Sequence, residues 1–264
     1  VSGADRRDPH AGMLYVVDRE SREVRPLTPN LEGMVHHLTW SNPNNLMATI
    51  CYGVQTHLER IDLASAKRAM LLGDVGVAFR NFERSAAGVV YAVGSTAQHP
   101  EELYGMDKEG LVRMTRSNPW LRDVALGEPT GEKVTAGDGV EIEGLMLWPV
   151  GYEKGERYPL VIVAHGGPEA HFSDGWLTSY SRWGQVLAGK GYFVWYPNYR
   201  SSTGRGVEYA KNDHGDLMGR EFDDNLDAIE HLADMGWVDP DRVGLGGGSY
   251  GGYAGAWAAT RHTD

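Results

Sequence analysis

The sequence predicts two architectures in one chain: an antiparallel β region followed by an α/β region with a mostly parallel sheet. Three observations predict this. Short strand-like runs repeat at a regular interval in the first part, strand-like and helix-like runs alternate in the second, and one G-x-S-x-G run stands between a strand and a helix. We therefore divide the chain into residues 1–120 and residues 121–264.

The composition excludes several classes of protein. Hydrophobic residues make up 41% of the 264, which is enough for one or two packed cores and excludes a disordered chain. The formal net charge of −11 argues against a nucleic-acid partner, which would favour a basic face. The single cysteine, Cys51, excludes a disulfide scaffold and a cysteine-based zinc site. No run approaches the roughly 20 apolar residues of a membrane span, so we expect no membrane partner.

A five-residue pattern that ends in aspartate occurs three times in the first part. It spans 14–18, 58–62 and 103–107, at steps of 44 and 45 residues. After each copy come a short polar turn and another strand-like run, at 24–28, 69–72 and 111–115. Two further strand-like runs lie between successive copies: 35–40 and 46–51, then 77–82 and 89–93. Four short strands per repeat of about 40–50 residues are typical of a β-propeller blade. Residues 1–120 therefore predict a partial propeller of two to three blades; the alternative is a generic antiparallel β domain with accidental spacing.

The second part opens with a predicted hairpin, 132–137 with 140–148, turned at the favoured dipeptide Asp138-Gly139. Strands and helices then alternate, with strands expected at 160–164, 192–196 and 243–246 and helices at 177–188, 219–235 and 251–261. On the second of these helices, Phe222, Leu226, Ile229 and Ala233 share one face. Such alternation implies a mostly parallel sheet with helices on both faces.

The strongest chemical signal is Gly247-Gly248-Ser249-Tyr250-Gly251, between an apolar strand and a helix of small residues. A serine nucleophile needs a sharp strand-to-helix turn with small neighbours, because the backbone folds tightly there and the hydroxyl must stay exposed. The N–H groups at the start of the helix favour the negative charge of a tetrahedral intermediate. Ser249 is therefore the predicted nucleophile, in the N-terminal half of an α/β-hydrolase domain.

A second signal is His165-Gly166-Gly167-Pro168, directly after the buried strand 160–164. Hydrolases with this architecture place such a turn where a backbone N–H completes the oxyanion hole, and the other N–H comes from the residue after the nucleophile. In this interpretation the oxyanion donor after the nucleophile is the N–H of Tyr250. We expect His165 and Gly166 to support the turn, and His165 to be a hydrogen-bonding residue rather than a catalytic base.

A third signal is the loop from Pro197 to Gly204, which includes Tyr199 and Arg200 and follows the strand 192–196. A loop at the carboxyl end of a strand in such a sheet lies on the active-site side. The functional interpretation is a pocket wall. The structural alternative, which we favour for Arg200, is a turn held by an ion pair with Asp223 or Asp224.

The sequence after Ser249 contains no usable general base. In this fold the catalytic acid and histidine follow the serine along the chain. His262 and Asp264 share the helix that begins at the serine, about 20 Å along its axis at 1.5 Å per residue. We therefore expect a fragment that is truncated at both ends, lacks the catalytic Asp and His, and is inactive alone.

Together these motifs resemble those of the prolyl oligopeptidase family of serine peptidases, particularly its acylaminoacyl-peptidase and dipeptidyl-aminopeptidase-like members. The resemblance covers roughly residues 100–264 and is carried by six segments: 100–104, 138–144, 165–168, 197–200, 238–242 and 248–253. His165 stands where dipeptidyl-peptidase IV-like members usually carry tyrosine, which favours the acylaminoacyl or oligopeptidase branch. Ser201 departs from the glycine that usually follows the arginine, and this puts the loop conformation in question.

The resemblance implies a propeller that limits access to the hydrolase site, so that short peptides enter and folded proteins do not. It implies Ser249 as the acyl-enzyme nucleophile and the N–H groups of Gly167 and Tyr250 as the oxyanion hole, without a metal or an organic cofactor. For the complete protein we expect a cytoplasmic serine peptidase that acts on short peptides, with a homo-oligomer as one option for its assembly. The alternatives are a carboxylesterase that uses the same turn and a non-catalytic propeller scaffold.

Overall fold

The computed structural model describes residues 1–3, 12–107, 110–180 and 182–262, and the chain forms two compact units. The first unit contains residues 1–121 and two short later segments, 173–176 and 203–207; the second contains the remainder. Backbone hydrogen bonds tie both segments into the first unit, because Asp174 N–H donates to Val54 and Gly53 N–H donates to Gly204.

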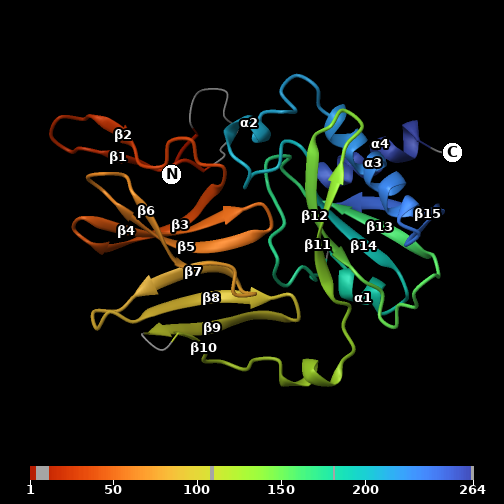
Figure 1. Ribbon diagram of the computed structural model, residues 1–264, viewed down its shortest axis with the longest axis horizontal. Coiled ribbons are helices and arrows are strands. Elements are labelled where there is room, and N and C mark those ends of the chain that lie inside the picture. Colours follow the sequence, from red (N-terminus) through yellow and green to blue (C-terminus); the bar gives the residue numbers. More distant parts are fainter. Residues whose placement is uncertain (4–11, 108–109, 181, 263–264) are drawn as a thin grey trace. The chain divides into compact units, whose positions relative to one another are not determined.

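The first unit is built from antiparallel strands that pair in chain order (Figure 1). A hairpin is formed by β1 (Tyr15–Val17) and β2 (Val24–Pro26). One four-stranded sheet consists of β3 (Met34–Asn42), β4 (Asn45–Tyr52), β5 (Gln55–Asp62) and β6 (Arg68–Leu72). A second consists of β7 (Ala78–Arg84), β8 (Val90–Thr96), β9 (His99–Asp107) and β10 (Gly110–Arg113). The predicted four-strand repeat is thus confirmed for two sheets, and the short 3-10 helix η1 (Pro119–Asp123) follows them.

The aspartate pattern marks the same structural position in successive sheets. Its second copy lies on β5 and its third on β9, each the third strand of its sheet. In the first two copies the aspartate closes the following turn, because Asp18 accepts from Ser21 N–H and Asp62 accepts from Ser65 N–H, both at 2.8 Å. These hydrogen bonds lower the pKa of both carboxyls. The residue after each serine, Arg22 and Ala66, adopts a positive φ. The turn after the third copy begins at residues 108–109, outside the described residues.

The strand β4 is buried on both faces, and this organises the core of the first unit. Leu46, Ala48 and Ile50 pack on one side with residues from β1 to β5, while Met47 packs on the other side with residues of β7, β8 and β9. Because neighbouring side chains on a strand point to opposite faces, the sheet β3–β6 has an apolar layer on each side. Face-to-face stacking of small sheets is the packing that a propeller requires.

The second unit is a five-stranded sheet with helices on both faces (Figure 1). The strands lie in the order β11, β12, β14, β13, β15, with bounds β11 (Pro129–Thr135), β12 (Glu141–Leu147), β13 (Tyr158–Ala164), β14 (Phe193–Asn198) and β15 (Val238–Gly247). The helices are α1 (Gly184–Ala188), α2 (Val207–Ala210), α3 (Arg220–Asp234) and α4 (Tyr250–Arg261).

The alternating directions of side chains along β14 show which helix covers which face of the sheet. Phe193 and Trp195 of β14 point into a core shared with Ala228 and Leu232 of α3. Tyr196 points the other way, where its hydroxyl lies against Gly184 at the start of α1. The predicted two-faced α/β arrangement and the hairpin turned at Asp138-Gly139 are therefore confirmed, with β11 and β12 antiparallel.

Two details of the prediction are wrong. The sheet is mixed rather than mostly parallel, because β12 pairs antiparallel with both β11 and β14, whereas β13 is parallel to β14 and β15. The helix expected from Leu177 begins only at Gly184, since Ser179 and Arg182 exchange backbone hydrogen bonds in a turn. On α3, the expected face is present: Phe222 is buried and Leu226, Ile229 and Ala233 are half-buried, while Ala228 and Leu232 are also buried.

Candidate active site

Ser249 occupies a strained turn between β15 and α4. Its backbone has φ 53° and ψ −116°, a left-handed φ that costs free energy for any residue with a Cβ. The side chain is exposed and does not cap α4, so the hydroxyl is not engaged by the helix that it precedes. Main-chain crowding explains the small neighbours: a Cβ on Gly247 or Gly251 would lie 2.0 or 2.1 Å from the carbonyl oxygen of Ala164. The predicted sharp turn at Ser249 is confirmed.

The turn at His165 lies beside Ser249 because β13 and β15 are parallel neighbours, with Ala164 opposite Gly247. Loops at the carboxyl ends of adjacent parallel strands meet at the same edge of a sheet. A Cβ on Gly166 would be 3.0 Å from the Cβ of Ser249 and 3.6 Å from its Oγ. Gly167 has φ 134°, and a Cβ there would be 2.4 Å from Glu169 N, so glycine is required.

His165 is buried and hydrogen-bonded through both ring nitrogens. Its Nδ1–H donates to the Gly166 carbonyl at 2.9 Å, and Nε2 accepts from the Ser202 hydroxyl at 2.9 Å. Tyr199 stacks on the ring at 4.3 Å between centroids, and its hydroxyl donates to the His165 carbonyl at 2.8 Å. Burial lowers the pKa of His165 to about 4, so the imidazole is neutral at pH 7. These contacts fix the turn beside Ser249.

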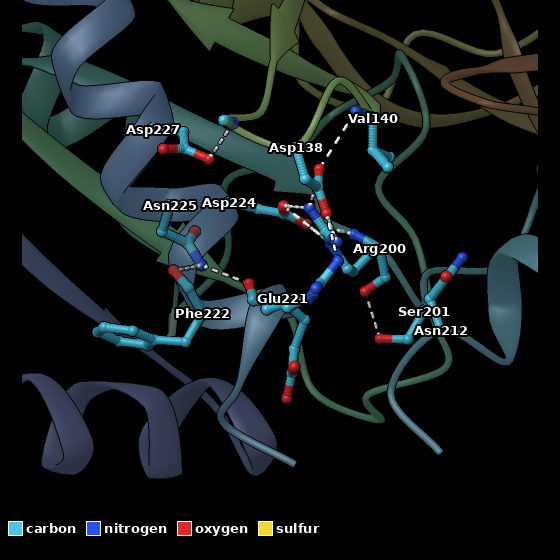
Figure 2. A network of polar contacts seen from close by, with 12 residues as sticks. Asp138, Val140, Arg200, Ser201, Asn212, Glu221, Phe222, Asp224, Asn225 and Asp227 are labelled. Atoms are coloured by element: carbon cyan, nitrogen blue, oxygen red, sulfur yellow. Dashed lines mark hydrogen bonds and ion pairs between the residues drawn. The ribbon is translucent and has the colours of Figure 1, made fainter. Parts of the chain in front are cut away.

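Arg200 is the centre of a buried ion-pair cluster (Figure 2). Its guanidinium donates to Asp224 through Nε at 2.9 Å and to Asp138 through Nη1 at 2.6 Å, and Arg220 also donates to Asp138 at 2.9 Å. The hydrogen bond from Arg200 holds the pKa of the Asp138 carboxyl well below its usual range. Asp224 is therefore the partner on α3, while Asp223 is exposed. The cluster ties the hairpin turn, the loop after β14 and α3 together.

Ser201, the departure from the family pattern, is fully buried with φ 76°. This is the backbone region that favours glycine, and the Ser201 hydroxyl is turned onto the carbonyl of Arg200. The loop thus keeps a left-handed residue after the arginine although the side chain has changed.

Three residues of this region were not found from the sequence. Ser202 holds His165, Asp138 shares Arg200, and Glu221 accepts a hydrogen bond from the Tyr250 hydroxyl at 2.6 Å. No sequence signal pointed to these contacts, because the partners are separated by 37, 62 and 29 positions.

Within residues 1–3, 12–107, 110–180 and 182–262, no group of three or more His, Cys, Asp or Glu side chains could hold a metal ion. In the same part of the chain, none of the helices combines the length and apolarity needed to cross a bilayer.

Comparison with known proteins places this geometry in a family. Residues 178–264 match the model of the prolyl oligopeptidase family. The uncharacterized peptidase YuxL of Bacillus subtilis is 32% identical over 161 residues, which cover 60% of this chain and 24% of YuxL. Dipeptidyl-peptidase 5 of Porphyromonas gingivalis is 27% identical over 256 residues, covering 94% of this chain and 36% of the relative.

Solved structures agree on the fold. Acylaminoacyl peptidase of Pyrococcus horikoshii superposes with a TM-score of 0.80 at 23% identity, covering 96% of this chain and 39% of that protein. Puromycin hydrolase superposes with a TM-score of 0.76 at 20% identity, covering 95% of this chain and 39% of that one. The chain thus spans well under half the length of the relatives it matches. From the motifs, the turn at Ser249 and these comparisons, the chain belongs to the prolyl oligopeptidase family.

Proposed function

We propose that the complete protein is a serine peptidase that hydrolyses short peptides through an acyl-enzyme on Ser249. The observation that carries this proposal is the strained, exposed Ser249 at the start of α4, with Gly166 packed against it. An exposed hydroxyl on such a turn can approach a carbonyl carbon while backbone N–H groups face the carbonyl oxygen.

The proposed oxyanion donors are the N–H groups of Gly167 and Tyr250. Both belong to turns that flank Ser249, and within the described residues neither N–H donates a hydrogen bond to another protein group. Attack by Ser249 Oγ forms a tetrahedral intermediate whose negative oxygen these donors stabilise. Collapse expels the amine, and water then hydrolyses the ester.

The general base in this mechanism is a histidine outside residues 1–264. His165 does not suit this role, because both of its nitrogens are engaged and its low pKa disfavours proton uptake at neutral pH. His262 stacks on Phe222 near the end of α4, about 20 Å from Ser249 at 1.5 Å per helical residue. On this proposal residues 1–264 alone are inactive.

Short peptides are the proposed substrates, because relatives named dipeptidyl-peptidase 5 and dipeptidyl aminopeptidase BIII cover 94% and 69% of this chain. The two four-stranded sheets and the β1–β2 hairpin are proposed to be two complete propeller blades and the outer strands of a third. Blades of this kind would restrict the site to substrates without folded structure.

The test uses the complete protein, a fluorophosphonate probe and a peptide amide. We expect covalent labelling and cleavage in the wild type, and a loss of about 10⁴–10⁶-fold in kcat for Ser249→Ala. The matched control is Ser65→Ala, which removes an exposed serine hydroxyl in the turn after β5 and should leave both readouts unchanged. Undiminished labelling and cleavage in Ser249→Ala would refute the proposed function.

A further inference from the structure

The turn that carries Ser249 has few side chains to hold it in place. Four of the seven residues from Gly247 to Tyr253 are glycines, and glycine gives the backbone the most conformational freedom. Of the others, Ser249 is exposed and Tyr253 is 44% exposed. The position of this backbone therefore depends strongly on Tyr250, whose side chain enters the protein.

The Tyr250 side chain is held at both its ring and its hydroxyl. The ring packs beside a buried cluster that contains Ala164, Tyr199 and Phe222. The hydroxyl donates to Glu221 Oε1 at 2.6 Å and accepts from the Met218 N–H at 3.2 Å. The start of α4 is thereby linked to the turn that precedes α3.

Glu221 is placed to hold this link. It is 2% exposed, lies in the first turn of α3, and also accepts from the Met218 N–H. In Figure 2 its side chain extends away from the Arg200 cluster, so the two networks are separate. Burial and the adjacent Glu221 carboxylate raise the pKa of the Tyr250 hydroxyl, which keeps it a protonated donor. A hydrogen bond to a buried carboxylate is stronger than one between neutral groups.

We propose that Glu221 is a positioning residue for acyl transfer, which holds Tyr250 and thereby the backbone N–H of residue 250 where the oxyanion develops. The inference rests on the proposed function, since it assigns a support to one of the proposed oxyanion donors. Displacement of a catalytic donor by about 1 Å can cost about 100-fold in rate, so the support should affect kcat rather than substrate binding.

The experiment is a double-mutant cycle in the complete protein. Tyr250→Phe, Glu221→Gln and the double variant are compared by kcat and KM on a peptide amide, with rates normalised to the sites titrated by the fluorophosphonate. We expect kcat to fall about tenfold for Tyr250→Phe and less for Glu221→Gln, because glutamine still accepts the hydrogen bond without the charge. The double variant should match Tyr250→Phe alone, and KM should stay within about twofold.

Tyr253→Phe is the control, because it removes a phenol hydroxyl from the exposed side of the same helix and should leave kcat unchanged. A kcat per titrated site that is unchanged in Tyr250→Phe overturns the inference, and so does a double variant whose loss is the product of the two single losses. Neither result affects the proposed function, which fails instead if Ser249→Ala retains labelling and cleavage.

Discussion

Two buried carboxylates, Glu102 in the first unit and Asp213 in the second, have opposite surroundings. In the first unit, burial of Glu102 opposes ionisation, but hydrogen bonds from Thr115, Ser117 and Arg113 lower its pKa to about 2. In the second unit, both oxygens of Asp213 are buried without a partner among the described residues, and burial, with the nearby carboxylate of Glu169, raises the pKa of Asp213 to about 6. Glu102 therefore has its charge satisfied by hydrogen bonds, whereas Asp213 does not.

Backbone strain is distributed in the same way. Left-handed residues of the first unit, such as Arg22 and Ala66, lie in hairpin turns where an aspartate closes the loop. Among the described residues, the non-glycine residues of the second unit with positive φ are Ser201, Met218 and Ser249, of which the first two are buried. Strain and unpaired polar groups gather at functional sites when the surrounding structure enforces them. This distribution supports the proposed function, in which the reactive centre lies in the second unit.

The largest expected effect comes from removing the charge at Arg200. Arg200→Met leaves Asp224 buried without its partner and should destabilise the second unit by about 3–5 kcal/mol, measured by urea unfolding. Arg122→Met, which removes an exposed arginine paired with Asp123, should change stability by less than about 0.5 kcal/mol. Equal effects of the two substitutions would show that the Arg200 cluster is not structural.

Glu102→Gln tests the hydrogen-bonded carboxylate of the first unit. The substitution should lower the free energy of unfolding by on the order of 2 kcal/mol at pH 7, because three donor residues lose a charged acceptor. The folded pKa of about 2 lies below the ordinary value of 4.5, so this stabilisation is complete above pH 4.5 and is lost as the pH falls towards 2. Thermal unfolding from pH 2 to 7 measures it. A stability difference between wild type and Glu102→Gln that does not change with pH would contradict the lowered pKa of Glu102.

Asp213→Asn tests the unpaired carboxylate of the second unit, whose effect on stability should depend on pH in the opposite direction to that of Glu102. The folded pKa of about 6 lies above the ordinary 3.8, so the wild type loses stability as the pH rises from about 4 to 6, whereas the variant has no such titration. The unfolding midpoint of the variant should therefore rise by a few degrees relative to wild type across that window and stay level above it. Parallel stability curves for the two proteins would contradict a raised pKa of the Asp213 carboxyl in the folded protein.

The smallest expected effect is at Ser201. Ser201→Gly should relieve the left-handed backbone and stabilise the protein by up to about 1 kcal/mol in urea unfolding, offset in part by the lost hydroxyl hydrogen bond. Ser201→Ala keeps the strain and loses the hydrogen bond, so it should destabilise. Ala66→Gly in the first unit should give a gain of about 0.5 kcal/mol at most, because that turn is closer to the surface.

The features that the sequence predicted are those set by neighbouring residues. The turn at Ser249 needs small residues on both sides, and the hairpin at Asp138-Gly139 needs a residue with positive φ, which Gly139 supplies at 89°. The aspartate repeat was visible for the same reason, since each aspartate acts on a serine three positions later. Local chemistry of this kind is readable without a structure.

The features that the sequence missed depend on distant partners. The antiparallel pairing of β12 with β14 joins segments about 50 residues apart, and only the packed sheet decides it. The start of α1 depends on a turn between Ser179 and Arg182 that interrupts a helix-like pattern. For Arg200 the sequence left Asp223 and Asp224 as alternative partners, of which Asp224 is the one in contact, and the second partner, Asp138, lies 62 positions earlier in a hairpin turn.

The backbones of Gly247 and Gly251 both lie against the carbonyl oxygen of Ala164, so that neither position has room for a Cβ. The separation between the end of β13 and the start of α4 consequently has a lower limit set by main-chain atoms, and any side chain at Gly247 or Gly251 would force the two segments apart.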